Sequence, residues 1–93
     1  MRGSSWISAD YSANATLVAG GVNTAGVTIR TAALLNVSGG FYGYITAGNG
    51  VMILGGHTTA AEMANELFVP AGLTIALVRI AGTGHLGMTY DIH

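Results

Sequence analysis

The chain has 93 residues, a length that allows one domain and excludes the two-part dinucleotide-binding fold. It is 51% apolar, has fifteen glycines and no cysteine, and carries only three basic and four acidic side chains. The lack of clustered Lys and Arg excludes a nucleic-acid partner, and the lack of cysteine excludes disulfides and thiolate metal sites.

The charge content is too low to coat a small globule with ionic groups. Ordinary soluble domains carry about 25% charged residues, whereas this chain has 8%. We therefore expect a surface of small polar residues that is partly buried against other copies, a homo-oligomer. We expect no membrane partner, because the uncharged stretch 31–61 is broken repeatedly by glycine and asparagine, and a spanning helix needs about 20 mostly apolar residues.

The N-terminal segment, residues 1–14, is expected to be an extended arm before a folded domain of residues 15–93. Ile7 and Tyr11 fall on the same face of an extended segment, because side chains alternate along a strand. Trp6, Ile7 and Tyr11 are therefore candidates for contacts between this arm and a neighbouring subunit.

From residue 15 to residue 56, short apolar runs alternate with glycine and asparagine clusters, which predicts many short strands joined by tight turns. The expected strands are 15–19, 26–31, 33–37, 41–47 and 51–54. The last two flank Gly48-Asn49-Gly50, a strong hairpin signal because Asn and Gly tolerate positive φ. Both faces of this hairpin are apolar, so it should be central in a sheet or covered by another subunit.

Residues 58–66 interrupt the strand pattern. Thr59 and Glu62 have the spacing of a capping box, and the alanines around them suit a helix. So short a helix is marginal unless it packs against other elements. A short helical turn and an irregular loop are both open interpretations of this segment.

The last two expected strands, 73–80 and 85–93, have the clearest pattern. A Pro-Ala-Gly turn precedes the first of them, and an Ala-Gly-Thr-Gly turn at 81–84 should separate the two. In the final strand, one face holds Leu86, Met88, Tyr90 and Ile92, and the other holds His85, Gly87, Thr89, Asp91 and His93. Together the segments predict an all-β fold, a small antiparallel β-sandwich or jelly roll of about seven or eight short strands.

Gly82-Thr83-Gly84-His85-Leu86-Gly87 spells G-x-G-x-x-G, the fingerprint of a dinucleotide-binding loop. That fingerprint requires a helix after the glycines and an acidic residue about 20 positions further on. Only six residues follow Gly87, and they alternate like a strand. We therefore expect no cofactor and interpret the motif as a glycine-rich turn.

No catalytic residue or metal ligand is predicted, and the chain is not expected to be an enzyme. His57, His85 and His93 lack the spacing of known metal motifs, and no serine lies in G-x-S-x-G. His85, Asp91 and His93 share one strand face. We interpret it as a solvated polar face, with a metal shared on a symmetry axis as the alternative.

Phe41, Tyr42 and Tyr44 form the main aromatic cluster. The two tyrosines fall on one face of an extended segment and Phe41 on the other, so one set can pack in the core while the other makes contacts. Two contact roles are open for the tyrosines, an interface anchor and, together with Trp6, a sugar-stacking platform.

The stretches "GGFYGYITAGNGVMILGG" (39–56) and "LFVPAGLTIALVRIAGTGHLGMTYDI" (67–92) combine Gly/Ala/Thr-rich strands with glycine turns. In this they resemble jelly-roll structural proteins of tailed bacteriophages, among them capsid decoration proteins and fibre or spike knobs. The resemblance implies a non-enzymatic virion protein, often trimeric, clamped to other coat subunits. The alternative function is a carbohydrate-binding module or a receptor-binding knob whose exposed aromatics recognise a cell-surface glycan.

Overall fold

The computed structural model describes residues 3–48, 51–56, 61–62 and 65–93. The seven strands in these residues form one antiparallel sheet, so the all-β prediction is confirmed. They are β1 (Gly3–Tyr11), β2 (Ala15–Val18), β3 (Val27–Ala47), β4 (Val51–Gly56), β5 (Ala61–Glu62), β6 (Leu67–Val69) and β7 (Ile75–Ile92).

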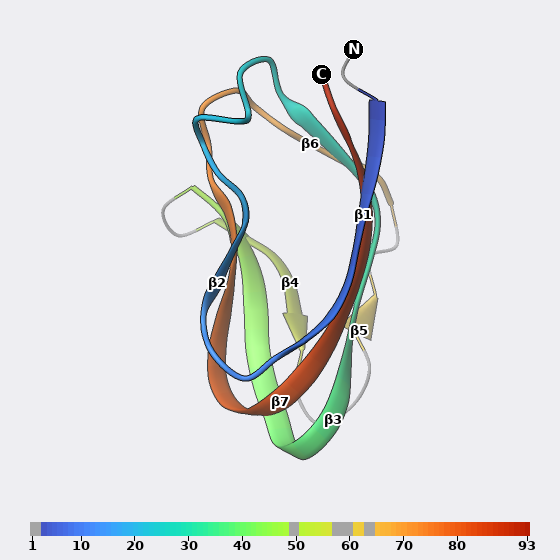
Figure 1. Cartoon of the computed structure of the whole chain (residues 1–93), viewed down its shortest axis with the longest axis vertical. Coiled ribbons are helices and arrows are strands. Elements are labelled where there is room, and N and C mark those ends of the chain that lie inside the picture. The colour runs from blue at the N-terminus through green and yellow to red at the C-terminus, as the bar shows by residue number, and fades with distance from the viewer. Residues whose placement is uncertain (1–2, 49–50, 57–60, 63–64) are drawn as a thin grey trace.

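Strands β3 and β7 form the centre of the sheet. They pair with each other from Val27↔Ile92 to Ala47↔Ile75, with several register shifts on the way. β1 and β2 pair with β7 on its other side, and β4, β5 and β6 pair with β3. Both long strands bend near their middle, so the sheet folds over on itself (Figure 1).

The bend divides the sheet into two halves. The first half contains β1, residues 83–92 of β7, residues 27–38 of β3, and β5 and β6. The second half contains β2, residues 75–81 of β7, residues 41–47 of β3, and β4. Figure 1 shows β1 and β2 on opposite sides of the molecule, with the bends of β3 and β7 at one end.

The hydrophobic core draws on both halves. Its most deeply buried members come from β3, β6 and β7 and form one cluster: Val27, Ile29, Leu34, Phe41, Ile45, Val69, Ile75, Leu77, Leu86 and Met88. Ile7 and Tyr11 of β1 pack against this cluster, as does Ile92, so the predicted alternation in the first and last strands is confirmed. Burial of this apolar surface holds the two halves together.

Glycines make the bend possible. Gly39, Gly40 and Gly82 have φ values of 72°, 67° and 70°, a region that glycine enters without steric cost. Ser38 pairs with Thr83 and the next ladder pair is Tyr42↔Ala81, so β3 has extra residues at the corner. Such a bulge bends a strand without ending its pairing. The predicted strand ends at 38–40 and 81–84 are therefore wrong, and these glycines are corners within two long strands.

Phe41 occupies the inside of the corner and is 1% exposed. Its backbone N–H donates to Oδ1 of Asn36 at 2.8 Å, which closes the bulge. A Cβ added to Gly84 would stand 2.6 Å from the Phe41 ring, and one added to Gly43 would stand 2.7 Å from it. Two glycines of the G-x-G-x-x-G motif thus serve the corner: Gly82 bends β7, and Gly84 leaves room for the ring.

The other local predictions have mixed outcomes. β4 pairs with β3 down to Ala47↔Val51, so the hairpin is confirmed, with its linking residues 49–50 outside the described ones. β4 pairs only with β3 among the described strands, so it is an edge strand and not central. Ala61–Glu62 is extended and pairs with β3, so the helical turn is wrong there; residues 57–60 and 63–64 lie outside the described ones.

The segment expected to be an arm lies within the sheet of its own chain. Gly3–Tyr11 pairs with β7 along its whole length, from Gly3↔Ile92 to Tyr11↔Gly84. Contact of residues 1–14 with a neighbouring subunit stays a prediction. No helix in the described part of the chain is long and apolar enough to cross a membrane.

The corner predicts different effects for three glycines of one motif. Gly82→Ala and Gly84→Ala should each lower the free energy of unfolding by about 1–3 kcal/mol, through left-handed backbone strain or overpacking against Phe41. Gly87→Ala should stay within about 0.5 kcal/mol of the wild type, because an added Cβ there meets nothing within 4 Å. Chemical denaturation of the three variants measures this, and equal effects at all three positions would contradict it.

Candidate functional site

The charged side chains are concentrated on the first half of the sheet. Asp10, Arg30, Glu62 and Asp91 lie on its strands, and Glu66 is joined to it by an ion pair with Arg30. β2, β4 and residues 41–47 of β3 contain no charged residue. The two halves therefore present outer surfaces of different chemistry.

Arg79 of β7 is the one charged side chain in the described strands of the second half. Its Nε donates to the carbonyl oxygen of Gly82 at 2.8 Å, which ties the guanidinium to the corner. Its backbone N–H donates to Oδ1 of Asn14 at 2.8 Å. Arg79 thus contributes to local structure at the bend.

The outer surface of the second half is the uncharged face, which consists of Thr16, Tyr42, Tyr44, Thr46, Ala76, Val78 and Ile80. Tyr44 pairs directly with Val78, Thr46 pairs with Ala76, and Thr16 pairs with Ala76 from the other side. None of these residues belongs to the core cluster, since the inward positions are taken by Ile45, Ile75 and Leu77. Tyr42 and Ile80 are exposed, so aromatic and aliphatic surface is open to contact here.

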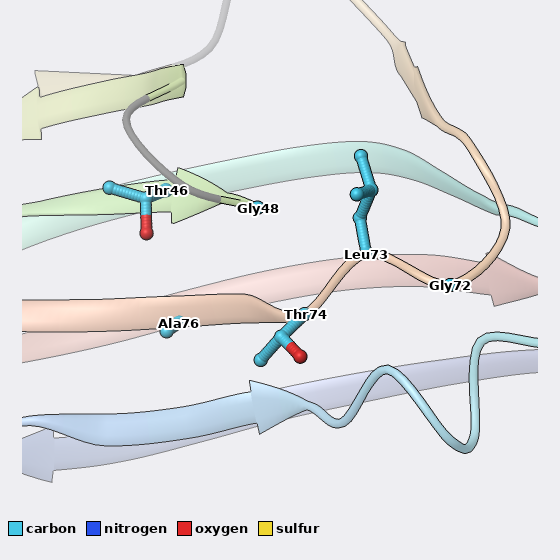
Figure 2. Close-up of a pocket in the computed structure, with 6 residues that line it drawn as sticks. All are labelled: Thr46, Gly48, Gly72, Leu73, Thr74 and Ala76. Atoms are coloured by element: carbon cyan, nitrogen blue, oxygen red, sulfur yellow. The ribbon is translucent and has the colours of Figure 1, made fainter.

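A shallow pocket of about 480 Å³ lies beside the uncharged face. Figure 2 shows its lining: Thr46 and Gly48 at the end of β3, Ala76 on β7, and Gly72, Leu73 and Thr74 on the segment that enters β7. The lining offers two threonine hydroxyls and apolar surface and no ionisable group. Such a pocket has no acid or base for catalysis, and it extends the uncharged surface.

Asn23 holds the rim of this pocket. It is fully buried, and its Nδ2 donates to the carbonyl oxygens of Pro70 at 2.8 Å and Leu73 at 3.1 Å. Its Oδ1 accepts the N–H of Gly26 at 2.9 Å, and its own carbonyl accepts the N–H of Gly72 at 2.7 Å. One side chain therefore fixes the turn before β3 to the turn before β7.

The outer surface of the first half carries a Ser–His–Asp cluster. Nδ1 of His85 lies 2.7 Å from Oδ1 of Asp10, and Nε2 of His85 lies 3.2 Å from Oγ of Ser8. With Nδ1–H donating to the carboxylate, Nε2 accepts the Ser8 hydroxyl proton. This is the order of groups in a nucleophilic triad.

In the described residues, the backbone beside this cluster is engaged in the sheet. Acyl transfer also needs N–H donors arranged around the developing oxyanion. The backbone of β7 beside Ser8 is already paired with β1 on one side and β3 on the other. Asp10 and Ser8 are exposed, so the cluster is open to water.

The same surface holds two further polar pairs. Oγ1 of Thr31 and Oγ1 of Thr89 are 2.6 Å apart across β3 and β7. Arg30 bridges the buried carboxylate of Asp91 and the exposed carboxylate of Glu66. Hydrogen bonding to Asp91, then the charges of Asp91 and Glu66, raise the pKa of Arg30 above its ordinary value. The predicted solvated face of the last strand is therefore wrong at Asp91, which is 2% exposed and paired with Arg30. His85 and His93 on the same face are half-buried and hydrogen-bonded.

The predicted contact residues divide between surface and core. Trp6 is the most exposed large apolar residue on the first half at 74%, whereas Ile7 and Tyr11 turn inward against the core. Phe41 is buried in the corner. Tyr42 is exposed and Tyr44 half-buried on the uncharged face, so the predicted split between Phe41 and the tyrosines is confirmed.

Sequence reasoning did not single out Val78 or Ile80, or the union of Ser8, Asp10 and His85. Val78 and Ile80 are recognised as part of the uncharged face only when β7 is known to pair with residues 41–47 of β3. The cluster joins residues 75 and 77 positions apart in the chain, and only the register of β1 against β7 brings them together.

Among the residues that the structure describes, no three His, Asp or Glu side chains gather as metal ligands, and His57 lies outside that part of the chain. Thr28 Oγ1 lies 2.7 Å from Nε2 of His93, so this ring is engaged in the sheet. Comparison with protein families, with curated proteins and with solved structures found no match to this chain.

Asn23→Ala should lower the free energy of unfolding by about 2–4 kcal/mol, because it leaves the buried N–H of Gly26 without its acceptor and removes the donor to the carbonyl groups of Pro70 and Leu73. The amide of Gly26, which loses its acceptor, should exchange with solvent faster. Thr24→Ala, at the exposed neighbouring position, is the matched control and should change little. Denaturant titration and hydrogen exchange measure both effects, and an Asn23→Ala protein as stable as the control would contradict the role given to Asn23.

Proposed function

We propose that this chain is a non-enzymatic structural subunit of a virion, which associates with copies of itself and with other coat subunits through the uncharged face. A capsid decoration protein or a fibre or spike component is the role that fits the sequence resemblance. A trimer is the stoichiometry which that resemblance implies.

The separation of charge between the two halves is the observation that carries this proposal. Charged groups keep a surface hydrated and oppose association. The uncharged face contains Tyr42, Tyr44, Val78 and Ile80, and removing this surface from water lowers the free energy. Interface cores are depleted in charge and enriched in aromatics. Contact through this face would also shield part of the apolar surface that the composition leaves without ionic cover.

The order of strand segments supports a jelly roll as the finer description of the fold. Counting each long strand as two segments, the first half runs β1–β7–β3–β5/β6 and the second half runs β2–β7–β3–β4. β5 and β6 pair with different parts of β3 along the same edge and together fill one position in the sheet. Counted in this way there are eight positions in two halves of four, with β3 and β7 crossing from one half to the other. Eight strands in two packed sheets define the jelly roll, an architecture that occurs in viral capsid and lectin domains.

Placing a charge on the uncharged face should disrupt self-association. Ile80 is 49% exposed, so the folded monomer should tolerate Ile80→Glu. In the assembly, the new carboxylate would be removed from water at the interface, which destabilises the contact. We expect the wild type to sediment at about three times its 9.4 kDa protomer mass and Ile80→Glu to sediment as a monomer. Sedimentation velocity over a range of concentrations measures this.

The control is Val22→Glu, since Val22 is 48% exposed in the turn before β3 and lies outside the uncharged face. This variant should associate like the wild type. A wild type that stays monomeric at high concentration, or an Ile80→Glu protein that associates as the control does, would refute the proposed interface.

A further inference from the structure

We propose that the outer surface of the first half binds a neutral saccharide, with Trp6 as the stacking surface and Ser8, Asp10 and His85 as hydrogen-bonding groups. We call this surface the Trp6 face; its residues are Trp6, Ser8, Asp10, Thr31, His85 and Thr89. It lies on the opposite half from the uncharged face, so this inference does not depend on self-association.

Trp6 is 74% exposed although it lies in the middle of a paired strand. The alternation of β1 sets its direction, because Ile7 and Tyr11 pack against the core and Trp6, Ser8 and Asp10 point outward. Removing a large apolar side chain from water is favourable. Folding does not bury the Trp6 indole, so a ligand that covers the indole would obtain this favourable free energy on binding.

Polar groups surround the indole at positions set by the strand register. Trp6 pairs with Thr89, and Thr89 is hydrogen-bonded to Thr31 on the next strand. Two residues further along β1, Ser8 pairs with Gly87, and two residues beyond that, Asp10 pairs with His85. At about 3.3–3.4 Å per residue, the backbones of Trp6 and Asp10 are roughly 13 Å apart.

This combination matches the chemistry of a sugar. A hexose ring has a face of C–H groups, which packs on an aromatic ring, and a rim of hydroxyls that both donate and accept hydrogen bonds. The Ser8, Asp10 and His85 side chains already hold one another in place, so less conformational entropy is lost on binding. The space above Gly87 is open, since an added Cβ would meet nothing within 4 Å.

The charge of the Trp6 face selects among sugars. Asp10 is an exposed carboxylate that accepts hydrogen bonds from hydroxyl groups and repels an anionic ligand. The distance from Trp6 to Asp10 exceeds one ring and suits two linked rings. We therefore commit to a neutral oligosaccharide of at least two hexoses as the occupant.

The chain has a single tryptophan, so its fluorescence reports on Trp6 alone. Titration with lactose, cellobiose and maltose, with sialyllactose as the anionic comparison, should give a saturable change in emission for at least one neutral sugar. Saturation-transfer NMR then measures affinity in the variants. Trp6→Ala and Asp10→Asn should each weaken binding about tenfold, and Trp6→Phe should restore part of the loss at the first position.

Val22→Ala is the control, because Val22 is an exposed apolar residue that lies on neither face. It should bind like the wild type, and circular dichroism should show the same fold in all variants. Absence of any saturable change with the neutral sugars, tighter binding of sialyllactose, or full affinity in Trp6→Ala would each overturn the proposal. Loss of self-association in Trp6→Ala without sugar binding by the wild type would make Trp6 a subunit contact instead.

Discussion

The packing of Phe41 into the corner of the folded sheet is the contact on which the rest of the structure depends. Its ring fits only because Gly43 and Gly84 have no side chains, and the strands turn there because Gly39, Gly40 and Gly82 accept positive φ. With the corner in place, the inward residues of both halves meet and exclude water. A straight β3–β7 ribbon would leave the same apolar residues exposed on one face.

Folding the sheet in this way also separates the molecule's two outer surfaces. Each outward position belongs to one half or the other, and of the charged residues that the structure describes, only Arg79 lies on the second half. Only 8% of the residues are charged, and they are not spread evenly over both outer surfaces. One outer surface is therefore charged and hydrated, and the other is the uncharged face. The proposed assembly and the proposed sugar site follow from this division and occupy opposite halves.

Local pattern was enough to predict the strand type and the facing of many side chains. Alternation placed Ile7 and Tyr11 on one face, grouped Leu86, Met88 and Tyr90 on one face of the last strand, and separated Phe41 from Tyr42 and Tyr44. It did not show that Ile7 and Tyr11, expected to contact a neighbouring subunit, pack against the core of their own chain. It failed where one residue type has two uses, because glycine ends strands in turns and bends them in bulges, and only tertiary packing decides between the two. The bonds from Asn23 to Pro70 and Leu73 and those of the Ser8–His85–Asp10 cluster join residues 47 to 77 positions apart, which no local window contains.

The passage of β3 and β7 through both halves has a consequence for how the chain folds. Neither half has a complete set of strands without the other, so the two should form and melt in one cooperative transition. The ladder between them joins Ala47 to Ile75 at its nearest point and Val27 to Ile92 at its farthest. Pairing between such distant segments requires closure of long loops before contacts compensate, which places this chain among slowly folding small proteins. A nascent chain therefore cannot complete the sheet until β7 has been synthesised.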